Sequence, residues 1–229
     1  MFLSVIIPVK NSSNNLEKCL DCFYPLHSQL VQIIIVDCCS TDGIDSVLIK
    51  HTSLPILHLC GSDDGIYDAF NKGVFEAKGD LVLFMGADDR INLDIFSAVN
   101  TFPDNASVLV GGITTNGIVE RWSKMLFGIR LLFRNIPHQA MLIRKDMLKE
   151  YPYELTYLTL SDYAWNLKHY WSKNINYRFT PIIFCEWAPN GISSIYIDNQ
   201  FKEIKPVLIK KYAPFLLSLL YQIYRLLFK

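Results

Sequence analysis

The run SVIIPV at residues 4–9 decides the fold, because it is short, continuous and rich in β-branched residues. A run of this kind is typical of a strand that is buried on both faces of a parallel sheet. Comparable runs follow, separated by stretches with helical periodicity. Strands that alternate with helices are joined by right-handed crossovers in an α/β sheet. We therefore predict an α/β fold with further strands at VQIIIVD (31–37), LPILHLC (54–60), DLVLFM (80–85) and SVLVGG (107–112).

The loop after the first predicted strand, KNSSNN at residues 10–15, contains residues that cap helices and no glycine. A dinucleotide-binding Rossmann site needs glycines at this turn so that the backbone can approach a pyrophosphate. The P-loop also needs its own glycines and a lysine, and neither pattern occurs in the chain. The sequence therefore argues against both of these site classes.

Polar side chains collect instead at the carboxyl ends of four consecutive predicted strands. Asn11 follows the first strand, Asp37 the second, Asp63 the third, and the pair Asp88 and Asp89 the fourth. Ligands of open α/β sheets bind at this edge. Each residue by itself has the alternative role of a helix cap or a turn residue. Their occurrence at four successive strand ends favours a ligand site.

The composition fits one folded domain of 229 residues, because 51% of the residues are hydrophobic and only 19% are charged. The 22 basic and 22 acidic residues cancel, so no overall charge favours a nucleic acid partner. The six cysteines follow no secreted disulfide spacing, and the first ten residues lack the features of a signal peptide, which favours a reducing cytosol. Cys19 and Cys22 form a CxxC motif. Because Cys19 shares helical spacing with Leu16 and Leu20, we interpret it as a core residue.

The second half of the chain has a looser pattern and no low-complexity linker. We predict a basic amphipathic stretch over 121–134, a strand around PHQAMLI (137–143), a helix at SDYAWNLKHYW (161–171) and a strand at YRFTPIIFCEW (177–187). Residues 1–200 are expected to form one domain, and residues 201–229 a basic and apolar helical extension.

The extension ends in YAPFLLSLLYQIYRLLFK (212–229), which predicts about fourteen residues of helix after Pro214, too short for a bilayer that needs about 20. Its polar residues share one narrow stripe; they are Ser218, Gln222, Arg225 and Lys229. Such an amphipathic helix is expected to lie on a membrane surface, assisted by Lys205, Lys210 and Lys211 against anionic head groups. The alternative is that it packs on the protein body or on a second subunit, which leaves a homo-oligomer open.

The motif GADD at residues 86–89 places two carboxylates together directly after a predicted strand. Their mutual repulsion is relieved by a divalent cation such as Mg²⁺ or Mn²⁺, which binds one or two carboxylates together with substrate phosphates. The alternative is a solvated turn that opens the next helix. The position at the ligand-binding edge favours the metal.

Five blocks of the sequence belong together: SVIIPVKNSSNNLEKCL, QIIIVDCCSTDG, DDGIYDAFNKGVFEAKGDLVLFMGADD, IPHQAMLIRKDML and LSDYAW. In this order and spacing they resemble bacterial family 2 glycosyltransferases of the GT-A fold. The resemblance covers about residues 2–195 and is strongest to the branch that builds cell-surface polysaccharides such as lipopolysaccharide. It implies a Rossmann-like, mixed and mostly parallel sheet flanked by helices.

The resemblance also implies a role for individual residues. Asp162 falls where the family keeps its catalytic base, with a helix N-cap as the local alternative. Asp88 and Asp89 match the element that holds ribose and a divalent metal, although the first position of that motif, often acidic, is Gly86 here. His138 and Gln139 are expected on the acceptor or diphosphate side. The residues expected to bind the donor nucleotide are Pro8, Asn11, Asp37, Asp63, Tyr67, Asn71, Lys72 and Asp88.

Two of these assignments keep an alternative. Lys72 either faces a phosphate or forms an ion pair with Asp68, four residues before it. Many family members have a second Asp or a Gly where Cys38 and Cys39 stand, so the nucleotide that Asp37 recognises stays open.

The function implied by the resemblance is inverting transfer of a sugar from a nucleotide diphosphate sugar to a hydroxyl group. A UDP-sugar is the expected donor, and a lipid-linked saccharide is the expected acceptor. The enzyme is expected to be cytoplasmic and peripheral on the inner face of the cytoplasmic membrane. Two rivals stay open: a nucleotidyltransferase, which usually begins with a glycine-rich loop, and a non-catalytic membrane-peripheral module of the same fold.

Overall fold

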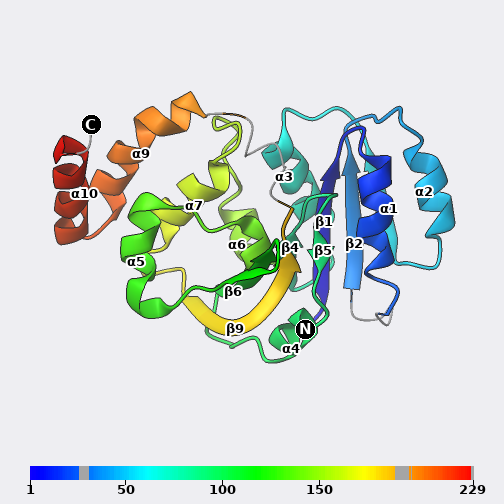
Figure 1. Cartoon of the computed structure of the whole chain (residues 1–229), viewed down its shortest axis with the longest axis horizontal. Coiled ribbons are helices and arrows are strands. Elements are labelled where there is room, and N and C mark those ends of the chain that lie inside the picture. The colour runs from blue at the N-terminus through cyan, green and yellow to red at the C-terminus, as the bar shows by residue number, and fades with distance from the viewer. Residues whose placement is uncertain (26–30, 189–195, 197, 228–229) are drawn as a thin grey trace.

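The computed structural model describes residues 1–25, 31–188, 196 and 198–227. Within these residues, nine strands form one sheet in the order β3-β2-β1-β4-β8-β6-β9-β5, and β7 pairs with β6 (Figure 1). The strands are β1 (Leu3–Val9), β2 (Val31–Asp37), β3 (Ile56–Cys60), β4 (Leu81–Phe84), β5 (Arg90–Ile91), β6 (Val108–Thr115), β7 (Ile118–Glu120), β8 (Met141–Arg144) and β9 (Tyr177–Glu186). The predicted α/β fold with a mixed sheet is confirmed.

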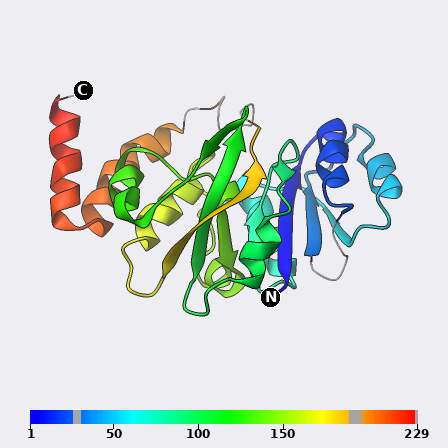
Figure 2. The same ribbon diagram turned by 60° about the horizontal axis from the view of Figure 1, so that its bottom comes forward.

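Helices flank the sheet on both sides. In the views of Figures 1 and 2, α1 and α2 lie on one side of β1 and β2, and α3 lies on the other. The helices are α1 (Ser13–Asp21), α2 (Ile44–Lys50), α3 (Ile66–Glu76), α4 (Ile95–Asn100), α5 (Lys124–Phe133), the 3₁₀ turn η1 (His138–Ala140), α6 (Lys145–Glu150), α7 (Ser161–His169), α9 (Asn199–Tyr212) and α10 (Phe215–Leu227).

The strand order reverses at β1, and this reversal sets the position of the site. The chain moves from β1 outward to β2 and β3, and then returns to β4 on the opposite side of β1. All of these neighbours pair in parallel. The connecting loops therefore leave the carboxyl ends of β1 and β4 in opposite directions, and a crevice opens between them where ligands of such sheets bind.

Burial follows the place of each strand in the sheet. Every residue of β2 and β4 is buried, as the continuous apolar runs predict. The run in β3 differs, because four of its residues are only partly buried and Cys60 is exposed. The reason is that β3 is an edge strand with a single neighbour, β2.

The second half of the sheet is mixed. Strand β8 runs antiparallel to both β4 and β6, whereas β9 runs parallel to β6. The strand predicted around PHQAMLI begins only at Met141, because His138–Ala140 form the 3₁₀ turn η1. Pro137 precedes this turn and has no N–H to donate to a strand ladder, and its carbonyl accepts from the Ala140 N–H. The turn holds His138 and Gln139 at the carboxyl edge of β4.

Helix α1 confirms the interpretation of Cys19 as a core residue. Leu16, Cys19, Leu20 and Phe23 are all buried with at most 1% of each residue exposed. Both Cys19 and Cys22 are free thiols, and burial raises the pKa of Cys19 well above its usual value. The CxxC spacing is therefore the spacing of one helix face.

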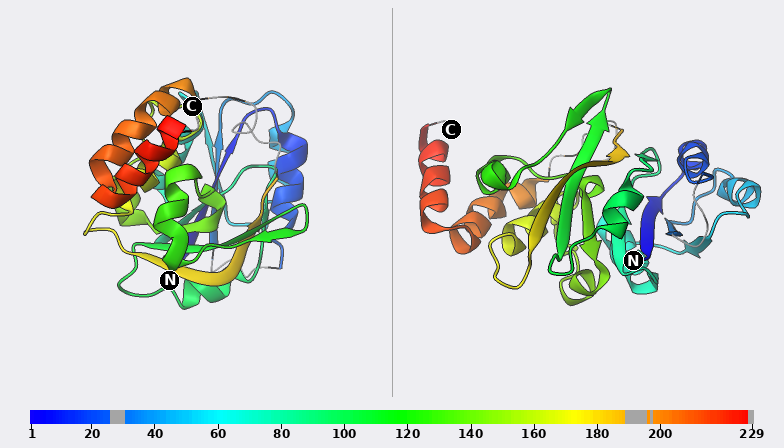
Figure 3. Two further views of the ribbon diagram at one scale, coloured as in Figure 1. Left: turned by 60° about the vertical axis from the view of Figure 1, so that its left-hand side comes forward. Right: turned by 90° about the horizontal axis from the view of Figure 1, so that it is seen from below.

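The C-terminal helices pack around α7 and α5 at one end of the molecule (Figures 2 and 3). Helix α9 buries Phe201, Leu208 and Ile209, and the Asp198 carboxylate caps its start by accepting from the Phe201 N–H. In α10 the buried residues are Ser218 and Tyr221. The predicted terminal helix is present, and Lys229 of its polar stripe lies outside the described residues.

Helix α7 ends in an aromatic cluster that keeps His169 neutral. The imidazole lies 4.7 Å from the Tyr151 ring and 4.8 Å from the Trp165 ring, measured between ring centroids. Burial, followed by the charge of Lys168, lowers the pKa of His169 to about 4. The fold that carries α7 is therefore most stable when this ring is uncharged.

We predict that His169→Phe reduces the loss of stability in mild acid. Below the ordinary His pKa of about 6.5 the unfolded chain binds a proton that the folded chain takes up only near pH 4, so the free energy of unfolding falls as pH decreases through this window. Phenylalanine cannot charge. Urea unfolding at about pH 7 and pH 5 should show a smaller difference for the variant than for the parent. Equal losses in both proteins would contradict this assignment.

Candidate active site

A cavity of about 490 Å³ lies at the carboxyl ends of β1 and β4, where the strand order reverses. Its size is within the range of roughly 300–1,000 Å³ that is usual for ligand pockets. The walls come from the loops after β1 and β4, the start of α3, the turn η1, the start of α7 and the residues after β9. Six of the predicted site residues line it: Pro8, Tyr67, Asp88, His138, Gln139 and Asp162.

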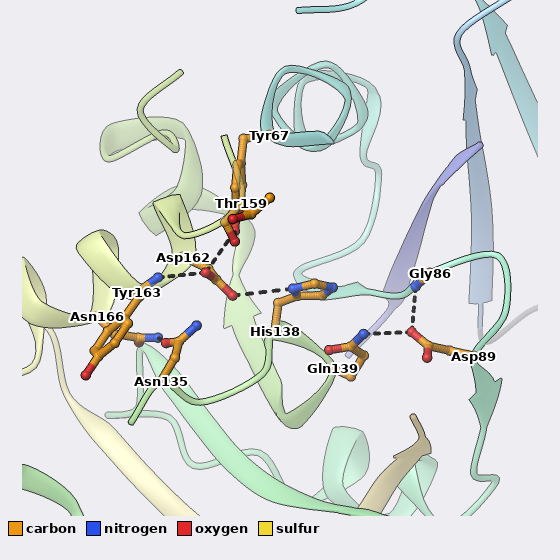
Figure 4. A network of polar contacts seen from close by, with 10 residues as sticks. All are labelled: Tyr67, Gly86, Asp89, Asn135, His138, Gln139, Thr159, Asp162, Tyr163 and Asn166. Atoms are coloured by element: carbon orange, nitrogen blue, oxygen red, sulfur yellow. Dashed lines mark hydrogen bonds and ion pairs between the residues drawn. The ribbon is translucent and has the colours of Figure 1, made fainter. Parts of the chain in front are cut away.

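Asp162 is held at one end of the cavity by donors from several segments (Figure 4). Its Oδ1 accepts from the Tyr67 hydroxyl at 2.8 Å and from the Tyr163 N–H at 2.7 Å. Its Oδ2 lies 3.4 Å from Nδ1 of His138. The carboxylate is therefore oriented with Oδ1 occupied and Oδ2 less engaged.

The local alternative for Asp162 does not match its position. The N-cap position of α7 is Leu160, and Asp162 is the second residue of the helix. Only 4% of the residue is exposed. Because a carboxylate at such a depth is stable only with hydrogen-bond donors around it, the ring of donors is what keeps Asp162 there.

Tyr67 is the main donor to Asp162. Its hydroxyl lies 2.8 Å from both Asp162 Oδ1 and the Thr159 carbonyl oxygen. Burial and then the negative charge of Asp162 raise the pKa of Tyr67 well above its usual value. The phenol thus stays protonated and donates. Helix α3, which carries Tyr67, is in this way tied to the start of α7.

The neighbouring aspartates after β4 have different surroundings. Asp88 is partly exposed and lines the cavity, and its carboxylate makes no hydrogen bond to any residue that the structure describes. Asp89 is buried, with 1% exposed. Its Oδ2 accepts from the Gly86 N–H at 2.6 Å and from Nε2 of Gln139 at 2.8 Å, and its Oδ1 accepts from the Ala188 N–H at 3.0 Å.

These three hydrogen bonds make Asp89 a junction of three cavity walls. Gly86 belongs to the loop after β4, Gln139 to η1, and Ala188 to the segment after β9. Burial raises the pKa of Asp89, and the hydrogen bonds from Ala188, Gln139 and Gly86 oppose that effect. The geometry therefore favours a structural role for Asp89 and leaves Asp88 as the carboxylate that faces a ligand.

The chemistry of Asp88 fits a divalent cation. Among the described residues, no three His, Cys, Asp or Glu side chains gather as a metal-ligand group. Mg²⁺ and Mn²⁺ do not require one, since they are bound through one or two carboxylates together with substrate phosphates. Gly86 makes room for this arrangement, because a Cβ atom there would lie 2.6 Å from Asp88 Oδ1 and 3.2 Å from Asp89 Oδ2.

The residues predicted to contact the nucleotide base lie beside the cavity and do not line it. Asp37 Oδ1 accepts from the Ser40 N–H at 2.9 Å, and Oδ2 lies 3.4 Å from Nε2 of His58. Burial opposes the ionisation of Asp37, but the hydrogen bonds from Ser40 and His58 outweigh it and lower the pKa. Asn11 accepts from the Thr41 N–H at 2.9 Å. These contacts fasten the loop after β1 to the loop after β2.

Asp63 also lies beside the cavity, where its Oδ1 accepts from the Gly65 N–H at 3.1 Å at the start of α3. In this arrangement it acts as a turn residue. Gly65 has a φ of 111°, a conformation that favours glycine.

Two residues of α3 that were predicted to bind the nucleotide, Asn71 and Lys72, do not line the cavity and are engaged by other partners. Asn71 forms a pair of hydrogen bonds with the backbone of Tyr153, donating to its carbonyl at 2.8 Å and accepting from its N–H at 3.0 Å. Lys72 forms the ion pair with Asp68 at 2.7 Å and donates to the Ser62 carbonyl. Of the two alternatives for Lys72, the structure has the ion pair.

Several cavity residues were not predicted from the sequence. They are Lys10, Ser12, Asn15, Ile66, Arg134, Asn135, Thr159, Leu160, Trp187 and Ala188. Lys10 and Ser12 belong to the polar loop after the first strand, so their place could have been anticipated. Arg134 ends the basic stretch 121–134, which carried no signal of a role in the site.

Comparisons with known proteins identify the family and support the fold. The family model described as Glycosyl transferase family 2 matches residues 4–185, a range that contains every predicted site residue. The PGL/p-HBAD biosynthesis glycosyltransferase of Mycobacterium tuberculosis is 28% identical over 214 residues, which cover 89% of this chain and 84% of that protein.

Solved structures share the fold at low sequence identity. The crystal structure of S. aureus TarS 1–349 in complex with UDP-GlcNAc has a TM-score of 0.73 and 20% identity, covering 93% of this chain and 68% of that one. Glucosyl-3-phosphoglycerate synthase from Mycobacterium tuberculosis, in complex with Mn²⁺, UDP and glucosyl-3-phosphoglycerate, has a TM-score of 0.64 and 13% identity, covering 92% of this chain and 80% of that one. At these identities the likeness supports the fold.

We predict that Asp89→Asn destabilises the protein by about 2–4 kcal/mol, whereas Asp88→Asn changes its stability by less than about 0.5 kcal/mol. The carboxylate of Asp89 accepts hydrogen bonds from the Gly86 N–H, the Gln139 side chain and the Ala188 N–H. An amide at position 89 would place an NH₂ group, itself a donor, against at least one of these donors. Asp88 has no such donors among the described residues. Urea unfolding of both variants measures the contrast. Two equally stable variants would show that the junction at Asp89 does not form.

Proposed function

Because this chain belongs to glycosyl transferase family 2, we propose that it transfers one sugar from a nucleotide diphosphate sugar to a hydroxyl group, with inversion at the anomeric carbon. The single observation that carries this proposal is the buried carboxylate of Asp162, oriented into a cavity that also exposes Asp88. An inverting transfer by direct displacement needs one base, and no covalent intermediate.

Asp162 acts as that base. Its Oδ1 is occupied by the Tyr67 hydroxyl and the Tyr163 N–H, so Oδ2 takes the proton of the acceptor hydroxyl. The acceptor oxygen then forms its bond to the anomeric carbon. The bond from that carbon to the diphosphate oxygen breaks, and its electron pair leaves on the diphosphate. General-base assistance of this kind contributes about 10²- to 10⁴-fold in rate.

The donor diphosphate lies toward Asp88 and Lys10. Among the residues that the structure describes, the charged side chains that line the cavity are Lys10, Arg134, Asp88 and Asp162, and their formal charges cancel. Because a diphosphate adds negative charge to this balance, a divalent cation held by Asp88 fits the site. When bound, Mg²⁺ or Mn²⁺ supplies the positive charge that stabilises the departing diphosphate.

The nucleotide lies over the carboxyl ends of β1 and β2. Pro8 forms the cavity wall there, and Asp37, Asn11 and Asp63 occupy the neighbouring loops. UDP is the proposed nucleotide, supported by the UDP and UDP-sugar complexes of the two structurally similar proteins. Recognition by Asp37 requires its carboxylate to exchange the His58 contact for a base N–H.

We propose a lipid-linked saccharide as the acceptor and the inner face of the cytoplasmic membrane as the place of reaction. In the described part of the chain, none of the helices combines the length and hydrophobicity that crossing a bilayer needs. Helix α10 instead turns its buried Ser218 and Tyr221 toward the protein. Its outward face exposes at least 40% of seven apolar residues: Phe215, Leu216, Leu219, Leu220, Ile223, Leu226 and Leu227.

The charge around this face favours an anionic lipid surface over a second copy. Residues 199–227 contain one acid, Glu203, and the exposed basic side chains Lys202, Lys210, Lys211 and Arg225. Lys205, which was also expected to assist at the head groups, packs over the Tyr163 and Tyr221 rings, and burial lowers its pKa to about 8. Two copies that met through α10 would bring these positive charges together. Anionic head groups neutralise them, and the apolar face enters the acyl boundary as in an interfacial helix.

We predict that Asp162→Asn lowers the turnover of UDP-sugars with Mn²⁺ by about 10²- to 10⁴-fold. Release of UDP, with water as acceptor, measures the rate across a panel of UDP-sugars. Asp146→Asn is the matched control, because Asp146 is an exposed residue in the first turn of α6. Chelation of the cation with EDTA should abolish the release. A parent protein that releases no UDP from any donor, or an Asp162→Asn variant as fast as the control, would contradict the proposal.

We also predict that Leu216→Ser combined with Leu226→Ser weakens membrane binding. These side chains are 75% and 78% exposed, so their replacement leaves the packing of α10 intact. Sedimentation with vesicles that contain phosphatidylglycerol measures the bound fraction. The control is Ile49→Ser, which changes an equally exposed residue on α2. Sedimentation of the double variant at the level of the control would count against α10 as the membrane contact.

A further inference from the structure

Arg134 joins the active-site cavity to the exposed face of α5. It lines the cavity, and it is the C-cap residue of α5. Its side chain is 61% exposed. The proposed chemistry gives this guanidinium no role, although among the described residues Arg134 and Lys10 are the Arg and Lys side chains that line the cavity.

Helix α5 presents an apolar ridge that ends beside Arg134. Met125, Ile129 and Phe133 follow one another at four-residue spacing, which places them on one face of the helix, and Leu126 lies beside them. Their exposed fractions are 84%, 42%, 40% and 55% for Met125, Ile129, Phe133 and Leu126. Burial of Phe127, Leu131 and Leu132 turns the opposite face toward the protein.

This ridge meets α10 at Phe133, the ridge residue next to Arg134. Phe133 packs edge-on against the Tyr224 ring at 4.9 Å and lies 6.0 Å from the Tyr221 ring, measured between centroids. Helix α5 lies between α10 and the sheet in the views of Figures 1, 2 and 3. An apolar chain can therefore pass from the proposed membrane face along α5 to the cavity.

The charge beside the ridge is positive and incompletely neutralised. Glu120 accepts from both Arg130 and Arg134, so one carboxylate serves two guanidinium groups. Arg130 also lies 5.3 Å from the Trp122 ring centroid. A phosphate at Arg134 would neutralise the remaining positive charge. The guanidinium can donate two parallel N–H hydrogen bonds to phosphate oxygens, a geometry that suits arginine.

Arg134 lies on the acceptor side of the cavity. Its neighbour Asn135 also lines the cavity, and the Oδ1 atom of Asn135 is 3.5 Å from Nδ2 of Asn166 in α7. Asn166 follows Asp162 by one helical turn, and Tyr163 fixes α7 to α5 by donating to the Leu131 carbonyl at 2.8 Å. The donor side lies at the carboxyl end of β1, with Pro8 in the strand and Lys10 directly after it. Arg134 is therefore placed with the base and not with the nucleotide.

We propose that Arg134 binds the phosphate of a lipid phosphate acceptor whose apolar chain lies along the Met125–Ile129–Phe133 ridge of α5. This inference rests on the proposed function and narrows the acceptor to an anionic amphiphile. The sugar hydroxyl at the phosphate end reaches Asp162, and the chain leaves the cavity toward α10. Nothing in this arrangement uses the cation or the donor diphosphate.

The test is equilibrium binding of decyl phosphate, at concentrations at which it stays monomeric, to the full chain saturated with UDP and Mn²⁺. Saturation with UDP and Mn²⁺ occupies the donor side of the cavity, so that decyl phosphate is left to bind on the acceptor side. Arg134→Gln should weaken decyl phosphate binding about tenfold or more, because it removes a charge-assisted pair, and should leave binding of the neutral decyl glucoside unchanged. Arg134→Lys should give an intermediate affinity, since it keeps the charge and loses the planar fork.

Two matched controls complete the design. Arg130 shares Glu120 with Arg134 but does not line the cavity, so Arg130→Gln leaves Glu120 to Arg134 alone and should weaken decyl phosphate binding less than Arg134→Gln does. Ile129→Ser should weaken decyl phosphate binding, whereas Ile49→Ser on α2 should not.

The outcomes separate this inference from the proposed function. If Arg134→Gln weakens UDP binding and leaves decyl phosphate binding as in the parent, Arg134 serves the donor diphosphate and the inference is wrong. Equal decyl phosphate binding by the parent, Arg134→Gln and Arg130→Gln would overturn it as well. Failure of the parent to bind or turn over any UDP-sugar would overturn the proposed function itself.

Discussion

The Asp89 carboxylate lies where water does not reach, and a buried charge of this kind is stable only among hydrogen-bond donors. Its donors come from the loop after β4, from η1 and from the segment after β9. These three segments are far apart in the chain, and each one contributes further residues to the cavity wall next to its contact. The shape of the site therefore depends on satisfying one carboxylate. Asp89 makes its hydrogen bonds inside the protein, whereas the carboxylate of Asp88 is left to face a ligand in the cavity.

The positions of the first four strands were predictable in outline, because β1, β2 and β4 are buried on both faces, which forces continuous apolar runs. The second half of the sheet was harder to predict. Strand β9 alternates between buried, partly buried and exposed residues, and η1 interrupts the run that predicted a longer strand before Met141. Local patterns carry no information about antiparallel pairing between segments as distant as β4 and β8.

The residue types in the sequence predicted many members of the site. They could not predict which of these side chains reach the cavity. The pair Asp88 and Asp89 was visible in the sequence, but nothing local tells that one is buried and the other faces the cavity. Asn71 and Lys72 lie in the motif that the family resemblance singled out, yet of the α3 residues predicted to bind the nucleotide only Tyr67, in the first turn of the helix, lines the cavity, while Asn71 and Lys72, further along the helix, bond to Tyr153 and Asp68. A sequence motif indicates which helix supplies a site, and the position along that helix decides which residues reach it.

The sequence of α10 likewise did not predict which face of the helix is buried. Its sequence predicts an apolar face and a polar stripe, and an ordinary surface helix would bury the apolar face. Here Ser218 and Tyr221 are buried, while residues such as Leu216 and Leu226 are exposed. This orientation follows from the contacts that α5 and α9 make with Tyr221. Phe133 of α5 makes an aromatic contact with the Tyr221 ring, and Lys205 of α9 makes a cation–π contact with it. In the proposed function, a lipid surface covers this exposed apolar face. The contacts of Phe133 with Tyr221 and Tyr224, which help to set the position of α10, therefore also place that proposed membrane face beside the end of α5 that borders the cavity.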